Sequence, residues 1–236
     1  MAVRLAESLA DRGMFDADDV MSRYIAWYRE GAFDTGPVAE RVFARIAAGV
    51  PRGAAAKSVN EERGGMTAGC NPAHRCPPLA MTRELAEEAL LEAASREAAL
   101  THFHPLAGDV ATAIAVLCRR LINGVPWPDS LVAAATGRQE PTKRALGVLE
   151  PELLDRSGYA PDVLAAAVHF LDRHDDFTSA LEASIAFAGN GNYCPVLVGA
   201  IGGARWGERS VPKAPLRHVE LLPRSRAAAV RLAMGW

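Results

Sequence analysis

His102 and His104 stand one residue apart, directly before a stretch whose pattern predicts a long helix. Histidine titrates near neutral pH, so both side chains are candidate catalytic acids or bases. A histidine beside a helix start can equally have a purely structural role. The sequence alone leaves both interpretations open.

A second candidate site is the loop Ala188-Gly189-Asn190-Gly191-Asn192-Tyr193. Glycine and asparagine adopt positive φ most readily, which favours a tight loop whose backbone N–H groups turn toward a ligand. Pro195 suits the first turn of a following helix, and a helix N-terminus is a good place for a phosphate or a ribose hydroxyl. We therefore predict a ligand-binding loop, although a sharp turn between two helices would also explain the pattern. The predicted ligand-binding residues here are Gly189, Asn190, Gly191, Asn192 and Tyr193.

A third group, Cys70, His74, Arg75 and Cys76, lies in a stretch rich in glycine and proline. Cysteine and histidine bind zinc, but no second pair stands at matching spacing, so the sequence predicts no metal site here. Arg75 is a fixed cation whose planar donors suit a phosphate or a carboxylate, and its alternative role is to tie the loop to a helix end. Reduced thiols are expected in an intracellular protein.

The elements that must position these groups are helices. Apolar residues recur with a helical period, strand signals are almost absent, and 50% of the residues are hydrophobic with only 6% aromatic. We predict an all-α fold, a compact multi-helix bundle forming a single domain over residues 1–236. Helices are predicted over residues 82–99, 106–123 and 177–188, and a long loop over residues 51–79.

The overall charge excludes some classes of partner. A formal net charge of −2 argues against electrostatic binding of nucleic acid. No apolar run approaches the length of a membrane span, and the amphipathic N-terminus does not resemble a signal peptide. We predict a cytoplasmic protein without a nucleic-acid or membrane partner.

Two segments carry a resemblance to a known family. Residues 176–207 begin with Asp176-Phe177, pass through the glycine–asparagine loop and end in a small-residue helix closed by Trp206-Gly207. Residues 69–79 match a Gly-Asn-Gly-x-x-Met-Arg-x-x-Pro-Leu pattern at four positions and depart from it at three. The matching residues are Gly69, Arg75, Pro78 and Leu79, and the departures are Cys70, Asn71 and His74. On these motifs the chain is identified as a member of the ADP-ribosylglycohydrolase (DraG-like) family, along nearly its whole length.

The resemblance implies a helical bundle in which the loops at 31–37, 69–79, 101–105 and 189–194 converge on a substrate cleft. It places Asn71 and Arg75 among the ligand-binding residues. Asp34 matches a family Asp-x-Gly loop and is the best surviving carboxylate, although it can also cap the following turn. His74, His102 and His104 are then the candidate acids.

The departures bear on the family's metal chemistry. The resemblance implies two magnesium ions held by N-terminal acids and by a Gly-Gly-Asp-x-Asp-Thr loop, but here Asn190 and Asn192 replace both loop aspartates and Tyr193 replaces the threonine. The family's N-terminal acidic motifs would precede Met1, so the chain is either a short member or begins downstream of the true gene start. Magnesium prefers charged oxygen ligands. We therefore expect no metal and no other cofactor.

These observations favour a metal-independent hydrolase that cleaves an N-ribosyl or related glycosidic bond in an ADP-ribosyl or nucleotide-like substrate. The alternative is a catalytically inactive relative that binds an ADP-ribose-like ligand or a modified partner. A third possibility is a structural protein whose cleft is a relic. Without the family's first helix, the bundle should expose apolar surface, which predicts a homodimer.

Overall fold

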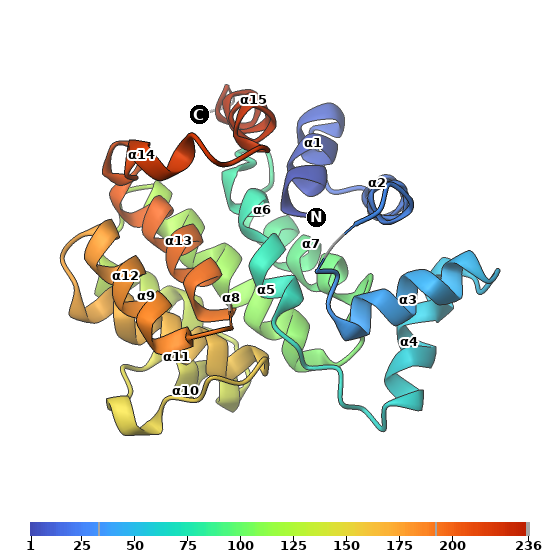
Figure 1. The fold of residues 1–236 in the computed structure, drawn as a ribbon, viewed down its shortest axis with the longest axis horizontal. Coiled ribbons are helices and arrows are strands. Elements are labelled where there is room, and N and C mark those ends of the chain that lie inside the picture. Colours follow the sequence, from blue (N-terminus) through green and yellow to red (C-terminus); the bar gives the residue numbers. More distant parts are fainter. Residues whose placement is uncertain (33, 192, 235–236) are drawn as a thin grey trace.

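The computed structural model of the chain describes residues 1–32, 34–191 and 193–234 and confirms the all-α prediction. Helices follow one another along the chain and pack into a multi-helix bundle (Figure 1). The described residues include no strand; the one β-bridge between them pairs Gly69 with Tyr159. The first half of the chain contains α1 (Ala2–Arg12), α2 (Ala17–Arg29), α3 (Pro37–Ala47), α4 (Arg52–Glu62), α5 (Asn71–Arg75), α6 (Pro77–Met81), α7 (Glu87–Ala99) and α8 (Pro105–Ile122). The second half contains α9 (Trp127–Ala135), α10 (Glu140–Leu146), α11 (Ala160–Arg173), α12 (Phe177–Ala188), α13 (Tyr193–Trp206), α14 (Lys213–Leu216) and α15 (Leu222–Ala233), with short 3₁₀ turns at Pro151–Leu153 and Glu208–Ser210.

Helix α8 is the centre of the bundle. Most of its residues are buried, and α5, α6, α7, α9, α11 and α13 all pack against it. His104 caps its N-terminus, because the imidazole Nδ1 accepts a hydrogen bond from the Leu106 N–H at 3.2 Å. The apolar face of α8 therefore fixes where the segments that carry the candidate site residues meet.

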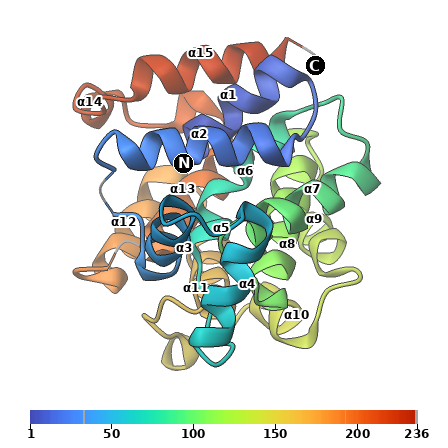
Figure 2. The ribbon, with the colours of Figure 1, turned by 90° about the vertical axis from the view of Figure 1, so that its right-hand side faces the viewer.

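The hairpin of α3 and α4 has a small apolar cluster of its own, in addition to Phe43 and Ala39, which reach the main core. It extends to one side of the bundle (Figures 1 and 2).

The prediction of a long loop over residues 51–79 is wrong, because this segment contains α4, α5 and α6. The alanine-rich start of α4 favours a helix in spite of Gly53. The small cluster consists of Val38, Val42, Ala55, Ala56 and Val59.

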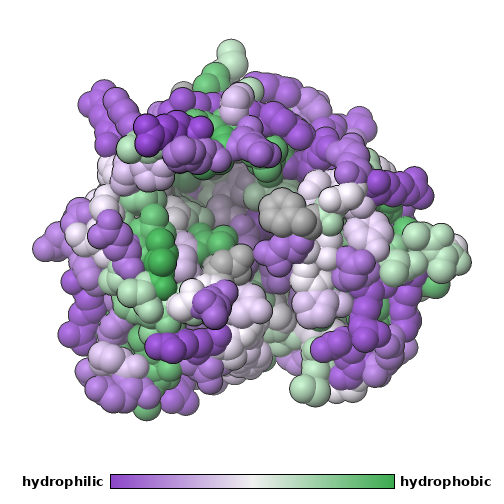
Figure 3. Space-filling view, viewed as in Figure 1, coloured by the Kyte–Doolittle hydropathy of each residue, from purple (hydrophilic) through white to green (hydrophobic). Residues whose placement is uncertain are grey.

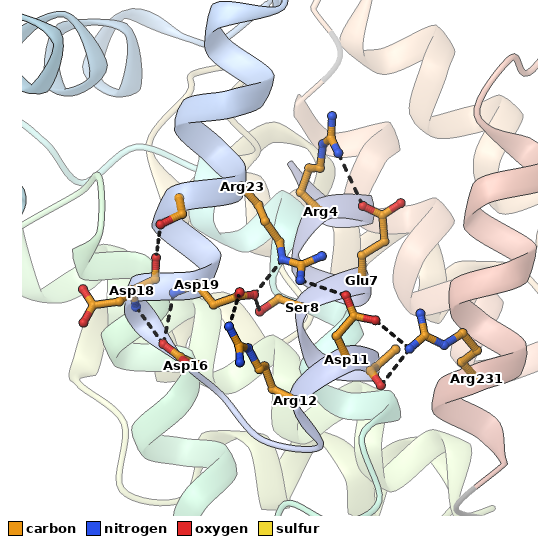
Figure 4. Close-up of polar contacts among 12 residues, drawn as sticks. Arg4, Glu7, Ser8, Asp11, Arg12, Asp16, Asp18, Asp19, Arg23 and Arg231 are labelled. Carbon is orange, nitrogen blue, oxygen red and sulfur yellow. Dashed lines mark hydrogen bonds and ion pairs between the residues drawn. The ribbon is translucent and has the colours of Figure 1, made fainter.

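The N- and C-terminal helices lie side by side. A network of charged side chains joins α1 to α2 and α15, with Asp11 accepting hydrogen bonds from Arg23 at 2.8 Å and from Arg231 at 2.7 Å (Figure 4). Arg224 on α15 also pairs with Glu7 at 2.7 Å. These contacts close the bundle by bringing the two ends of the chain together. Among the described helices, none is both long and apolar enough to cross a lipid bilayer.

Candidate functional site

The loop that carries Asp34 is attached to the start of α5. The Asn71 side-chain amide donates a hydrogen bond from Nδ2 to the Thr35 carbonyl oxygen at 2.9 Å. Gly36, with φ of 74°, packs so closely that an added Cβ would collide with the Asn71 amide. The sequence prediction that these two segments converge is thereby supported by a direct contact, and Asn71 holds the loop rather than standing free for a ligand.

Tyr193 brings the beginning of α13 to the same place. Its ring stacks on the His74 imidazole, with centroids 6.4 Å apart and an interplanar angle of 22°. Gly158 also lies against the ring, since an added Cβ there would be 3.5 Å from the ring carbon Cζ. Tyr193 remains 40% exposed, so one part of the ring faces solvent while the rest fixes His74.

His74 is held neutral at physiological pH. Burial lowers the pKa of its imidazole to about 4, although a hydrogen bond with the Tyr193 backbone and the charge of Asp34 act in the opposite direction. The same carboxylate contributes, after burial, to raising the pKa of the Cys70 thiol to about 12. Asp34 is exposed and has a positive φ of 52°, which is unusual for a residue other than glycine. Asp34 therefore lies at the surface and acts electrostatically on His74 and Cys70.

The glycine–asparagine loop follows α12. Gly189 ends this helix with a φ of 61°, and the Gly191 N–H donates to the Ala188 carbonyl at 3.1 Å. Gly189 and Asn190 are exposed, and Asn192 lies outside the described residues. The described part of the loop is thus a tight turn beside Tyr193, as the sequence predicted.

Arg75 lies in the core, which differs from the cleft position that the sequence predicted. Its Nε lies 2.5 Å from Oε1 of Glu97, its Nη2 donates to the Glu97 carbonyl at 3.1 Å, and the Tyr24 hydroxyl donates to the same Oε1 at 2.6 Å. The two charged side chains are 3% and 0% exposed. Burial alone would lower the pKa of Arg75, but the Glu97 charge outweighs it and the pKa is raised. Arg75 therefore joins α5 to α7 through Glu97, and its buried side chain does not reach a ligand in this arrangement.

The other two histidines are also placed by the fold. His102 is 3% exposed, and its Nδ1 lies 2.9 Å from the Thr101 hydroxyl. Burial, with a smaller contribution from Arg75, lowers the pKa of His102 well below its usual value, so it cannot donate a proton as a cationic acid near neutral pH. Its Nε2 would lie 3.2 Å from a Cβ added at Gly69, which explains why glycine suits that position. The structural interpretation therefore fits both His102 and the N-cap His104 better than a catalytic one.

A cavity of about 450 Å³ lies between the α3–α4 hairpin and the body of the bundle, and Gly69 is part of its wall. It combines apolar and polar side chains, as small-molecule sites do. Its lining includes Arg63, Met66 and Tyr159, which belong to none of the sequence motifs. Met66 follows Gly64 and Gly65 and is 77% exposed, and the composition of this stretch does not reveal that exposure. The lining residues are Val38, Arg63, Gly65, Met66, Ala68, Gly69, His104, Gly158 and Tyr159.

The described residues contain no group of three or more histidine, cysteine, aspartate or glutamate side chains placed to hold a metal ion. Of the residues that the sequence placed at the site, Asp34 supplies a carboxylate and Asn190 supplies only an amide. This donor set does not fit the hard, charged oxygen ligation that a pair of magnesium ions requires.

Comparisons with known proteins agree with the motifs. The ADP-ribosylglycohydrolase family model matches residues 1–235. An ADP-ribosyl-[dinitrogen reductase] glycohydrolase from Rhodospirillum rubrum is 24% identical over 227 residues, covering 94% of this chain and 72% of the relative. A solved structure described as an ADP-ribosylglycohydrolase-related protein complex superposes with a TM-score of 0.79 at 30% identity, covering 99% of this chain and 78% of that one. Sequence motifs, family model and fold therefore agree that the chain belongs to the ADP-ribosylglycohydrolase family.

Proposed function

We propose that this chain hydrolyses a glycosidic bond to ribose in an ADP-ribosyl or nucleotide-like substrate, without a bound metal ion. Family membership supports the class of reaction. The observation that carries the proposal is the convergence of the Asp34 loop, the His74 segment and Tyr193 at one place on the surface. Each comes from a different part of the chain, so the fold assembles a site from them.

Asp34 is the group to which we assign activation of the attacking water. Glycosidic cleavage through an oxocarbenium-like transition state requires a base or an anion on one side of the sugar. The Asp34 side chain is exposed, and its charge acts on the neutral imidazole of His74. The stacked rings of His74 and Tyr193 then form a wall that positions the sugar. His74 does not act as a cationic acid, because its imidazole is neutral.

The cavity beside Gly69 is the place to which we assign the nucleotide-like part of the substrate. Its volume, about 450 Å³, is within the range of small-molecule sites. Tyr159 offers a partly exposed ring for stacking, and Arg63 a cation for a phosphate. A substrate that spans Gly69 would reach from this cavity toward Asp34.

The proposal is tested by comparing two matched variants. Asp34→Asn removes the charge assigned to catalysis, and Asp129→Asn removes an exposed charge at the start of α9, far from the site in sequence. Product release is measured from ribosylated proteins, dinucleotides and nucleosides. We expect Asp34→Asn to lose about 100-fold or more and Asp129→Asn to behave as the wild type. Activity that survives Asp34→Asn unchanged would refute the assignment.

The second candidate function is ligand binding without turnover. Glu40, in the first turn of α3, is exposed, and hydrogen bonds from Thr35 and Tyr28 lower its pKa, which keeps it ionised. With His74 neutral as well, the described residues around Asp34 supply bases but no evident acid for the leaving group. Calorimetry with ADP-ribose separates the two functions, because saturable binding together with an absence of product from every substrate would favour the binding protein.

A further inference from the structure

Further hollows lie outside the site assigned to hydrolysis. A large one, visible between α13 and the α1–α6 side in Figure 3, is lined mainly by apolar side chains. A smaller one has a volume of about 230 Å³ and lies where the connection between α6 and α7 and the first turn of α7 meet the end of α8. The walls of this smaller hollow carry charged groups, so the chemistry of a ligand can be inferred from them.

Positive charge dominates the wall of the smaller hollow. Three guanidinium groups line it against one carboxylate, that of Glu87. The arginines are Arg83, Arg119 and Arg120. Like charges gathered around a concave surface reinforce one another's potential, so the hollow attracts anions. The N-terminus of α7 adds to this field, because its N-cap residue Ala86 also lines the hollow and provides no side-chain cap.

Arg119 is fixed in this wall by the chain around the end of α6. Its Nε donates to the Ala80 carbonyl at 2.6 Å, and its Nη2 donates to the Thr82 carbonyl at 2.7 Å. Partial burial lowers the pKa of Arg119, although the charges of Glu87 and Glu84 act in the opposite direction. These carboxylates therefore do not compensate fully for the lost hydration, and a bound anion would stabilise the charged guanidinium.

Arg120 and Asn123 lie one turn apart at the end of α8 and both line the hollow. The Arg120 Nη2 donates to both carboxylate oxygens of Glu87, at 2.7 and 2.8 Å. Both side chains are accessible to solvent, and an ion pair of this kind is weak because water and salt compete for it. An anion in the hollow can therefore replace Glu87 or share Arg120 with it, and the Asn123 amide offers a further donor.

We propose that this hollow binds a small phosphate-bearing anion, which accepts hydrogen bonds from Arg120 and Asn123 beside the charge of Arg119. A phosphate accepts several charge-assisted hydrogen bonds at once, and the planar guanidinium matches its geometry. The volume of the hollow is below the range of drug-sized sites, which suits a small ligand. This inference goes beyond the proposed hydrolysis and does not depend on it, because none of these residues belongs to the site assigned to hydrolysis.

The probes are inorganic phosphate and ribose 5-phosphate, and their binding to the full chain is measured by calorimetry and by the shift in Tm at constant ionic strength. Arg120→Gln removes one guanidinium. Its matched control is Arg96→Gln, because Arg96 also makes an exposed ion pair but does not line the hollow. Glu87→Gln removes the competing carboxylate, and its control is Glu88→Gln, in the same turn of α7 but outside the lining.

We expect saturable binding to the wild type and to both controls, an affinity about tenfold weaker in Arg120→Gln, and a tighter affinity in Glu87→Gln. The two changes act in opposite directions because one removes a donor and the other removes its competitor. Tighter binding of ribose 5-phosphate than of phosphate would support a phosphate ester as the ligand. Equal or weaker binding would support free phosphate.

Absence of saturable binding of both probes to the wild type would overturn the proposal. So would an unchanged affinity in Arg120→Gln with an unchanged fold by circular dichroism, or a weaker affinity in Glu87→Gln. A Tm shift that sodium chloride reproduces at the same ionic strength would also overturn it, because such a shift would reflect general screening of charge.

Discussion

At the scale of single residues, the buried ion pair between Arg75 and Glu97 has the largest expected effect on stability. Both side chains are almost fully excluded from solvent, so removing one leaves an uncompensated charge in the core. We expect Arg75→Met to lower the free energy of unfolding by about 3–5 kcal/mol. The control is Arg120→Met, which breaks the partly exposed pair with Glu87 at 2.7 Å and should cost less than about 1 kcal/mol. Urea unfolding of both variants checks this, and equal losses would contradict the structural role of Arg75.

His74 makes stability depend on pH. The unfolded imidazole takes up a proton below its usual pKa near 6.5, whereas burial keeps the folded pKa at about 4. The unfolded state therefore binds more protons between these values, and the stabilisation present above pH 6.5 is lost as the pH falls to 4. We expect the wild type to lose about 1–3 kcal/mol more than His74→Gln over this range. The pH series of urea unfolding measures the difference. Parallel curves for the two proteins would show that His74 titrates normally.

The site residues could be predicted from sequence only in part. Asp34, His74 and Tyr193 were recognised by type and motif, and the structure brings them together. For Arg75 and His102 the sequence left a binding or catalytic role and a structural role open, because a charged or titratable side chain in a motif gives no sign of burial until its partner is known. For Arg75 that partner is Glu97, on a helix whose pattern otherwise indicates a solvated face.

At the scale of elements, strong apolar periodicity made helices predictable and weak periodicity did not. The prediction of a helix over residues 177–188 coincides with α12 (Phe177–Ala188), where Asp176 caps the first turn through the Ser179 N–H. Helix α7 begins at Glu87 rather than at residue 82, because the Thr82 hydroxyl donates to the Pro78 carbonyl at the end of α6 instead of capping α7. Competing short-range hydrogen bonds of this kind are not visible in a sequence.

Helix α15 buries few of its side chains. Only Ala228 and Leu232 are buried, and ion pairs join the helix to α1 and, through Arg226 and Glu208, to the preceding 3₁₀ turn. We expect Asp11→Asn, which removes the charge shared by Arg23 and Arg231, to speed hydrogen exchange of the α15 amides several-fold while α8 is unaffected. The control is Glu92→Gln, which breaks an exposed pair with Arg96 within α7. Exchange that is equally slow in α15 and α8 would contradict this view.

At the scale of the whole molecule, the family fold persists over this chain while the polar groups of its cleft have changed. The superposition on a solved relative covers 99% of the chain. Asn190 and the neutral His74 stand in the segments where the motif comparison expects other residues. The homodimer predicted from sequence stays a prediction, as does a single domain over residues 1–236.

The central claim is that a glycosidic bond to ribose is cleaved here without a metal ion. The most direct measurement is the rate of ADP-ribose release from an ADP-ribosylated protein, with the purified chain first in excess EDTA and then in magnesium. We predict the same rate in both conditions and its loss in Asp34→Asn. Release that occurs only with magnesium, accompanied by a saturable magnesium-dependent rise in Tm of the wild type, would contradict the account.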